Sequence, residues 1–306
     1  MIHKKILIII IGFLLLNFGV YAVNNQYNQE KKDDYELNIA VTIPPQREFV
    51  KEVGGDKVKV TLMIPPGQDP HSYEPETSQM RELAKADIYF KVGSGIEFEK
   101  TWMTTMKEYN SDMKVIDGSK GVELLTMDSH EEVEGHNHED EDIDPHIWLS
   151  PKNAIKMIDN LVKGMIKKDS DNEEIYQENA EEYKNKLKDL DSELKNGLAP
   201  YKNDDFLVYH PSFGYLAHDY NLTQVPIQEE GKEPGTKGLE NIIDQAKKNN
   251  ISVVFVSPQF DESNAKTIAD EINGEVVMLN PLAGDYLDNI RKMKENLISG
   301  FEKGGN

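Results

Sequence analysis

Histidines in three similar turns are the residues of this sequence with the clearest potential for chemistry. His71 belongs to the segment DPHSYEP, His146 to DPHIWLSP and His210 to YHPSFGYLAHDY. In the first two, a proline restricts the backbone just before the histidine, and Asp69 or Asp144 could accept a hydrogen bond from the imidazole and so fix its tautomer. An imidazole oriented in this way is a common ligand of divalent metal ions. The repeated Asp-Pro-His tripeptide therefore indicates a metal site.

The expected positions of these histidines in the fold strengthen this interpretation, because one loop histidine by itself is usually an ordinary polar residue. Each of the three lies where a strand or loop gives way to a helix, and open α/β sheets bind ligands at the carboxyl ends of their strands. His218 follows His210 by about two helical turns in a segment that favours helix. We expect His218 to be a surface or packing residue.

The composition limits the ligand set and the partners. The chain has 306 residues, of which 38% are hydrophobic and 29% charged, which is typical of a folded protein with one large domain or two smaller ones. It has no cysteine, so disulfides and thiolate metal sites are excluded, and a tight metal site must use His, Asp or Glu. The formal charge of -21 disfavours nucleic acid as a partner and favours cations.

A strongly acidic segment, DSHEEVEGHNHEDEDID at residues 128–144, differs from the rest of the chain. It holds His130, His136 and His138 among nine acidic residues and has no lysine or arginine. Like charges at this density oppose packing, so we expect a mobile, solvated loop. Its His and carboxylate side chains could bind cations weakly, which predicts an accessory metal loop. The alternative is an acidic, solubilising loop with incidental histidines.

Alternating strands and helices are needed to place the histidine turns at the edge of a sheet. Such alternation occurs twice in the chain and favours parallel sheets covered by helices. In the first half the expected strands are 38–43, 57–63, 88–92 and 114–116, with helices near 46–53, 76–85 and 97–108. In the second half the strands are 206–209, 224–226, 252–256 and 276–279, with helices near 213–220, 238–248, 262–272 and 286–302. The sequence therefore predicts an α/β protein with two α/β lobes, each with a mostly parallel sheet.

A stretch with few strand signals, residues 151–197, separates the two lobes. Ser150 followed by Pro151 is typical of a helix N-cap and first helical position. A second helix is expected from residue 171 or 172 to about Lys195, and at 1.5 Å per residue it would be on the order of 35 Å long. Such a helix would restrict hinge bending. Its expected apolar face consists of Ile175, Tyr176, Ala180, Tyr183, Leu187, Leu190 and Leu194.

The N-terminus reads MIHKKILIIIIGFLLLNFGVYAVNNQ, with Lys4 and Lys5 before an apolar run. These flanks are typical of a secretory signal, although the run approaches the ~17–20 residues that can span a bilayer. Residues 1–23 are therefore expected to be a signal peptide or an N-terminal anchor. In either case the rest of the chain would lie outside the cytoplasm, in the periplasm or at the cell surface.

These signals together predict the domain organisation. A flexible tether covers residues 24–36, and an N-terminal α/β lobe covers 37–170, including the acidic loop. A linking backbone helix follows at 171–199, and a C-terminal α/β lobe covers 200–306.

Five motifs together resemble one protein family. In chain order they are DPHSYEP, DPHIWLSP, HPSFGYLAHDY, EEGKEP and VFVSPQF. Their order and spacing, and the acidic His-rich loop, are similar to the ZnuA-type zinc-uptake branch of the TroA-like, cluster A-I solute-binding proteins of ABC transporters, from about Ile39 to the C-terminus. The resemblance implies two α/β lobes joined by a long backbone helix, with zinc held in the cleft by His71, His146 and His210. It also implies delivery of zinc to a membrane permease, with limited lobe movement.

One position departs from the pattern of the family. Where the family commonly has an acidic residue after the late strand, this chain has Asn280, in LNPLAG. The fourth group on the metal could then be a water molecule or the Asn280 oxygen, and Asp285 is a poor substitute because it lies five residues further on. Three neutral imidazoles favour zinc over manganese, which prefers oxygen ligands. The expected cargo is zinc, with manganese the less favoured alternative.

Two other functions could use the same residues. Three histidines with an open position also form catalytic zinc sites, but the chain has no HExxH-type arrangement that would supply a general base. Glu229, Glu230 and Glu233 could approach the cleft, but they read equally well as a loop before the helix after Pro234. We therefore expect no enzyme. A metal-dependent adhesin of the same fold would differ only in its partner. The protein is expected to be a monomer.

Overall fold

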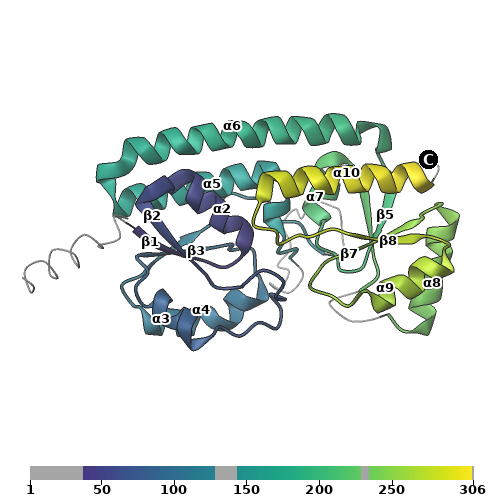
Figure 1. Ribbon diagram of the computed structural model, residues 1–306, viewed down its shortest axis with the longest axis horizontal. Coiled ribbons are helices and arrows are strands. Elements are labelled where there is room, and N and C mark those ends of the chain that lie inside the picture. Colours follow the sequence, from purple (N-terminus) through teal and green to yellow (C-terminus); the bar gives the residue numbers. More distant parts are fainter. Residues whose placement is uncertain (1–36, 128–142, 229–233, 305–306) are drawn as a thin grey trace, which may run out of the picture. The chain divides into compact units, whose positions relative to one another are not determined.

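The computed structural model describes residues 37–127, 143–228 and 234–304. These residues belong to one compact unit that contains two parallel sheets (Figure 1). The expected leader and tether at 1–36 lie outside the described residues, as do His130, His136 and His138 and the glutamates of the QEEGKEP segment. In the described ranges, no helix is both long enough and apolar enough to cross a membrane.

The first lobe is built on a parallel sheet with the strand order β2-β1-β3-β4. Its strands are β1 (Leu37–Val41), β2 (Val58–Leu62), β3 (Ile88–Lys91) and β4 (Lys114–Asp117). Helices α2 (Pro44–Gly54) and α5 (Pro151–Lys168) cover one face, and α3 (Thr77–Leu83) and α4 (Glu97–Tyr109) lie on the other (Figure 1). The strand expected to reach Ile43 stops at Val41, because Pro44 and Pro45 occupy the first turn of α2, where proline is tolerated.

The second lobe repeats this plan with the strand order β6-β5-β7-β8. Its strands are β5 (Asp205–Val208), β6 (Thr223–Pro226), β7 (Val253–Val256) and β8 (Glu275–Met278). Its helices are α7 (Gly214–Tyr220), α8 (Thr236–Lys248), α9 (Glu262–Glu271) and α10 (Tyr286–Gly304). Every residue of β7 is buried, as expected for a strand covered by helices on both faces. The predicted two-lobed α/β fold is confirmed.

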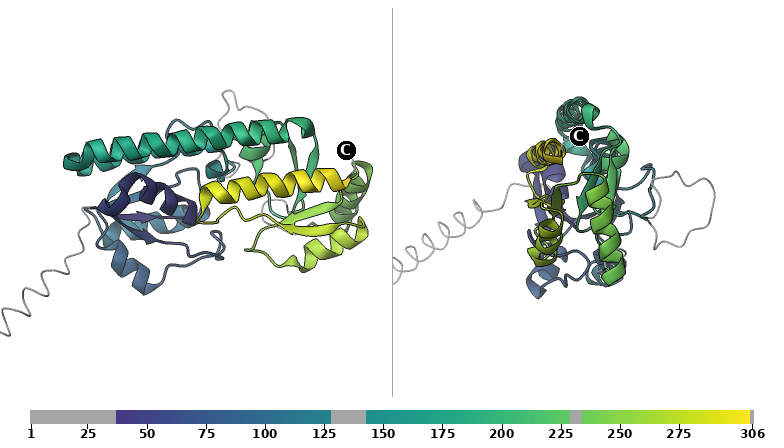
Figure 2. Two further views of the ribbon diagram at one scale, coloured as in Figure 1. Left: turned by 45° about the horizontal axis from the view of Figure 1, so that its top comes forward. Right: turned by 90° about the vertical axis from the view of Figure 1, so that its right-hand side faces the viewer.

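Helix α6 (Glu173–Leu198) runs along both lobes. It has 26 residues and so is about 39 Å long, and it packs against α2, α5 and α10. Figures 1 and 2 show α6 and α10 side by side. Six of its seven predicted apolar positions are buried, but Ile175 is 41% exposed, because Tyr176 takes the buried position of that turn. Short 3-10 turns flank the long helices at η1 (Gly55–Lys57), η2 (Ile147–Leu149), η3 (Ser170–Asn172) and η4 (Ala199–Tyr201).

One hydrophobic cluster extends through both lobes. It includes Phe49 of α2, Trp148 of η2, Phe206 of β5 and Tyr286 of α10. A second, smaller cluster lies within the second lobe, where α8 and α9 pack on the sheet. The two sheets therefore share a core on the side of α6 and α10, and this shared core limits how far one lobe can move against the other.

Candidate metal centre

One cleft brings together residues that follow strands of both sheets. It holds about 370 Å³ of empty space, part of it open to solvent. All three histidines singled out in the sequence line this cleft. The complete lining is Asp69, Pro70, His71, Ile96, Pro145, His146, Trp148, His210, Ser212, Gln259, Phe260, Pro281 and Leu282.

His210 lies between the other two histidines. Its ring centroid is 5.2 Å from that of His71 and 5.5 Å from that of His146, and both pairs of rings are nearly perpendicular. Within the described part of the chain, no three His, Asp or Glu side chains already form a complete metal site. The binding of an ion would therefore require the three rings to turn toward a common point, a movement that side-chain rotation can supply.

His146 is oriented by the carboxylate of Asp144. The His146 ring Nδ1 donates to Asp144 Oδ1 at 2.7 Å, and the His146 backbone N–H donates to the same oxygen at 2.9 Å. A proton held on Nδ1 leaves the lone pair of Nε2 available to a metal ion. Ring and backbone are thus fixed by one buried acceptor.

Residues of the second lobe hold Asp144 in place. The Tyr215 hydroxyl donates to the Asp144 carbonyl oxygen at 3.1 Å and accepts from the Leu125 backbone N–H at 3.0 Å. A Cβ added at Gly214 would lie 2.3 Å from Asp144 Oδ2, so only glycine fits at this approach. The support of His146 therefore depends on contact between the lobes.

His71 is held differently from the way its motif suggested. Asp69 bonds the turn: its Oδ1 accepts from the His71 backbone N–H at 3.0 Å, and its Oδ2 accepts from the Ser72 hydroxyl at 3.1 Å. Both oxygens of the Asp69 carboxylate therefore accept hydrogen bonds from donors within the same turn. His71 remains exposed on one side, although partial burial lowers the pKa of its ring.

His210 is enclosed by the surrounding protein. It is 5% exposed, and Gln228 is a polar side chain that acts on its ring. Phe260 stacks on the ring at 4.9 Å between centroids. Burial, and after it the neighbouring His146 and His71, lowers the pKa of His210 to about 3. The ring is therefore neutral at pH 7, the form that binds metal.

The two fourth-ligand candidates from the sequence do not line the cleft. Asn280 Oδ1 accepts from the Leu282 backbone N–H at 3.0 Å, so the amide oxygen closes a turn at the end of β8. Asp285 is exposed before α10. His218 is exposed on α7, as predicted. The family resemblance drew attention to Asn280 at the end of β8 but could not predict which way its side chain turns.

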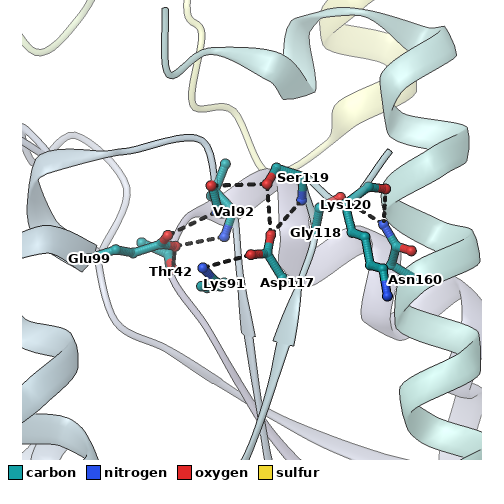
Figure 3. A network of polar contacts seen from close by, with 10 residues as sticks. Thr42, Lys91, Val92, Glu99, Asp117, Gly118, Ser119, Lys120 and Asn160 are labelled. Atoms are coloured by element: carbon teal, nitrogen blue, oxygen red, sulfur yellow. Dashed lines mark hydrogen bonds and ion pairs between the residues drawn. The ribbon is translucent and has the colours of Figure 1, made fainter. Parts of the chain in front are cut away.

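A polar network holds the end of β3 and the residues that follow it (Figure 3). Buried Glu99 accepts from the Thr42 hydroxyl and from the backbone N–H groups of Val92 at 2.7 Å and Gly93 at 3.0 Å. Burial raises the pKa of this carboxyl group. Next along the loop, the Ser94 hydroxyl donates to the Pro145 carbonyl at 2.5 Å, one residue before His146.

Several residues of the site were not assigned a role from the sequence. Trp148 follows His146 in the same motif, and its ring lies 5.3 Å from the imidazole. Gln259 and Phe260 belong to the motif VFVSPQF, which was recognised without a role for either residue. The position of this motif directly after a buried strand was the available signal.

Comparison with known proteins agrees with the fold. The family model described as "Zinc-uptake complex component A periplasmic" matches residues 39–300. The chain is 32% identical to "Zinc-binding lipoprotein AdcA" of Streptococcus pneumoniae over 283 residues, covering 90% of this chain but 56% of that protein. It is 32% identical to "High-affinity zinc uptake system protein ZnuA" of Bacillus subtilis, covering 81% of this chain and 79% of that protein.

A solved structure titled "Crystal structure of ZnuA" superposes with a TM-score of 0.81 at 38% identity, covering 86% of this chain and 98% of that one. The chain thus spans little more than half of the AdcA relative but nearly the whole of this solved structure. Because the family model covers most of the chain, the protein belongs to the ZnuA family of zinc-uptake components.

Proposed function

We propose that this protein captures zinc outside the cytoplasm, with His71, His146 and His210 as ligands, and delivers it to an ABC transporter permease. The observation that carries the proposal is the convergence of the three rings in one cleft, with His146 oriented by Asp144. The relatives named for zinc binding and high-affinity zinc uptake support the same cargo and transport role.

The lining of the cleft favours zinc over manganese. Among the described residues that line the cleft, Asp69 contributes the only carboxylate, and both of its oxygens already accept hydrogen bonds. Three neutral imidazoles suit zinc, whereas manganese prefers oxygen ligands. The described part of the lining offers no uncommitted carboxylate as a general base, which supports a binding protein rather than a hydrolase.

The test is competitive titration with zinc of metal-free protein that lacks the leader, comparing wild type, His146→Ala and His218→Ala. Loss of one of three ligands should weaken binding by orders of magnitude with the fold retained. His218 is the matched control, because it is an exposed histidine on the same lobe as His210. Unchanged zinc affinity in His146→Ala rejects the ligand set.

We further propose that His130, His136 and His138 raise the local zinc concentration and pass ions to the cleft. Deletion of residues 129–142 should remove weak sites and slow loading while one tight site survives the deletion. Loss of the tight site would show that the loop belongs to the main binding site.

A further inference from the structure

The loop that follows β7 contributes two side chains to the cleft. It runs from Ser257 to Asp261, where α9 is capped, and is closed by a backbone hydrogen bond from Phe260 to Ser257 at 3.1 Å. Phe260 stacks on His210, and Gln259 lines the same cleft. In the order β6-β5-β7-β8, β7 is the neighbour of β5, the strand that leads to His210. Gln259 is therefore closer in the sheet to the histidine strand than Asn280, which follows β8.

Two polar side chains in this part of the cleft have buried atoms without partners. Both amide atoms of Gln259, Oε1 and Nε2, are buried and have no hydrogen-bond partner within the described ranges. The same is true of the hydroxyl of Ser212, a residue that is 1% exposed and lies two positions after His210. Buried polar atoms are almost always paired in folded proteins, so an unpaired cluster at one place points to a ligand that pairs it.

The chemistry of these atoms selects the kind of ligand. A water molecule bound to a zinc ion is a strong hydrogen-bond donor, and an amide oxygen and a hydroxyl oxygen are suitable acceptors for it. Three protein ligands leave one position of a tetrahedral zinc ion for such a water. Neither Asn280 nor Asp285 lines the cleft, so neither competes for this position.

We propose that Gln259 and Ser212 are positioning residues that accept hydrogen bonds from the fourth ligand of the bound zinc ion, a water molecule. This inference rests on the proposed zinc site of His71, His146 and His210. It places the groups that support the fourth ligand on neutral side chains after β7 and β5, rather than after β8. A neutral acceptor adds no charge to the site, which keeps the preference for zinc over manganese.

The proposal predicts that zinc affinity and metal-free stability change in opposite directions. Gln259→Leu removes unpaired buried polar atoms, so metal-free protein should unfold at a higher urea concentration. Zinc affinity should fall about 10- to 100-fold, the usual effect of losing a group that supports a metal ligand. Ser212→Ala should behave in the same way. A residue with a purely structural role would lower both quantities together.

The experiment measures zinc and manganese dissociation constants, urea midpoints and the visible spectrum of the cobalt-loaded protein. The variants are Gln259→Leu, Gln259→Glu and Ser212→Ala, and the control is Gln245→Glu, the same charge change on an exposed face of α8. Gln259→Glu should narrow the preference for zinc over manganese, because a carboxylate can then reach the ion. Both Gln259 variants should alter the cobalt spectrum, which reports coordination number and ligand type. Gln245→Glu should leave all four readouts unchanged.

The outcomes separate this proposal from the proposed function. If wild type binds zinc tightly and His146→Ala does not, the zinc site stands. If both Gln259 variants then have the same zinc affinity and the same cobalt spectrum as wild type, only the positioning role is overturned. If wild type itself fails to bind zinc, both proposals are rejected. Should Gln259→Leu fail to fold, the smaller changes Gln259→Glu and Ser212→Ala decide the question.

Discussion

At the scale of single residues, the three histidines are held by three different means. A buried carboxylate orients His146, an aromatic ring packs on His210, and a turn carries the exposed His71. His146 and His210 are therefore enclosed in the cleft, whereas His71 remains accessible from solvent.

The difference between the two aspartates of the repeated tripeptide can be tested directly. Asp144→Asn keeps the shape of the side chain but weakens the hold on the protonated Nδ1 of His146, so zinc affinity should fall about 10- to 100-fold. Asp69→Asn is the matched control, since that carboxylate bonds the turn and no ring. Titration of both variants with zinc checks the prediction, and equal losses in the two would contradict it.

The burial of His210 predicts how the metal-free protein responds to acid. The ring has a pKa of about 3 in the folded protein and an ordinary value near 6.5 when unfolded. Between these values the unfolded state binds more protons, so the free energy of unfolding falls as pH decreases, by about 1.4 kcal/mol per pH unit from this group. Urea unfolding from pH 7 to pH 4 should show a shallower decline in His210→Gln. Parallel curves for the two proteins would rule out this assignment.

At the scale of elements, Glu48 of α2 joins the two lobes. Its carboxylate accepts from the Tyr183 hydroxyl and from the backbone N–H groups of Tyr286, at 2.6 Å, and Leu287, at 3.4 Å, at the start of α10. A side chain of the first lobe thus provides acceptors for a helix N-terminus of the second, where the free N–H groups favour a negative charge.

Removal of this carboxylate should destabilise the whole unit. Glu48→Ala leaves one hydroxyl and two backbone donors without their acceptor, which should cost about 1–3 kcal/mol in the free energy of unfolding. Glu52→Ala, one turn further along α2, is the control, because its 3.5 Å ion pair with Lys186 is exposed. Urea unfolding measures both variants. Similar losses in the two would mean that the Glu48 bonds add nothing beyond an ordinary surface contact.

At the scale of the whole described unit, several contacts resist lobe movement. The Trp148 indole N–H donates to the Pro281 carbonyl at 2.7 Å, and the Tyr286 hydroxyl donates to the Trp148 carbonyl at 2.7 Å. Together with the shared hydrophobic cluster and helix α6, these bonds fix the lobes beside the cleft. Zinc capture should therefore rely on side-chain and loop adjustment rather than on a wide hinge closure.

This expectation can be measured with spin labels, because the chain has no native cysteine. Labels at Tyr109→Cys on α4 and Lys266→Cys on α9 report the distance between the lobes from two exposed sites. Addition of zinc should change that distance by less than about 2 Å. A control pair within the first lobe, at Ser78 and Tyr109, gives the variation due to the labels. A change of several ångströms in the first pair alone would establish hinge closure.

Much of this protein follows from local sequence. Alternating apolar runs predicted all eight strands of the two described sheets, and the turns that carry the histidines, with the family resemblance, predicted the three rings that share the cleft. These features depend on the periodicity of buried side chains and on short-range restriction of the backbone. Residues close in the sequence determine both. The Ser150 cap and Pro151 at the start of α5 were likewise predicted from neighbouring residues alone.

The choice of polar partners was decided only by the tertiary structure. Asp144 bonds an imidazole and Asp69 does not, although both stand in the same tripeptide, because only Asp144 is enclosed by Tyr215 and Gly214 of the other lobe. Asn280 turns to a backbone N–H, while Gln259 lines the cleft. A polar side chain bonds whichever donor or acceptor the fold brings nearest, and for the groups around this cleft those neighbours come from segments far apart in the chain.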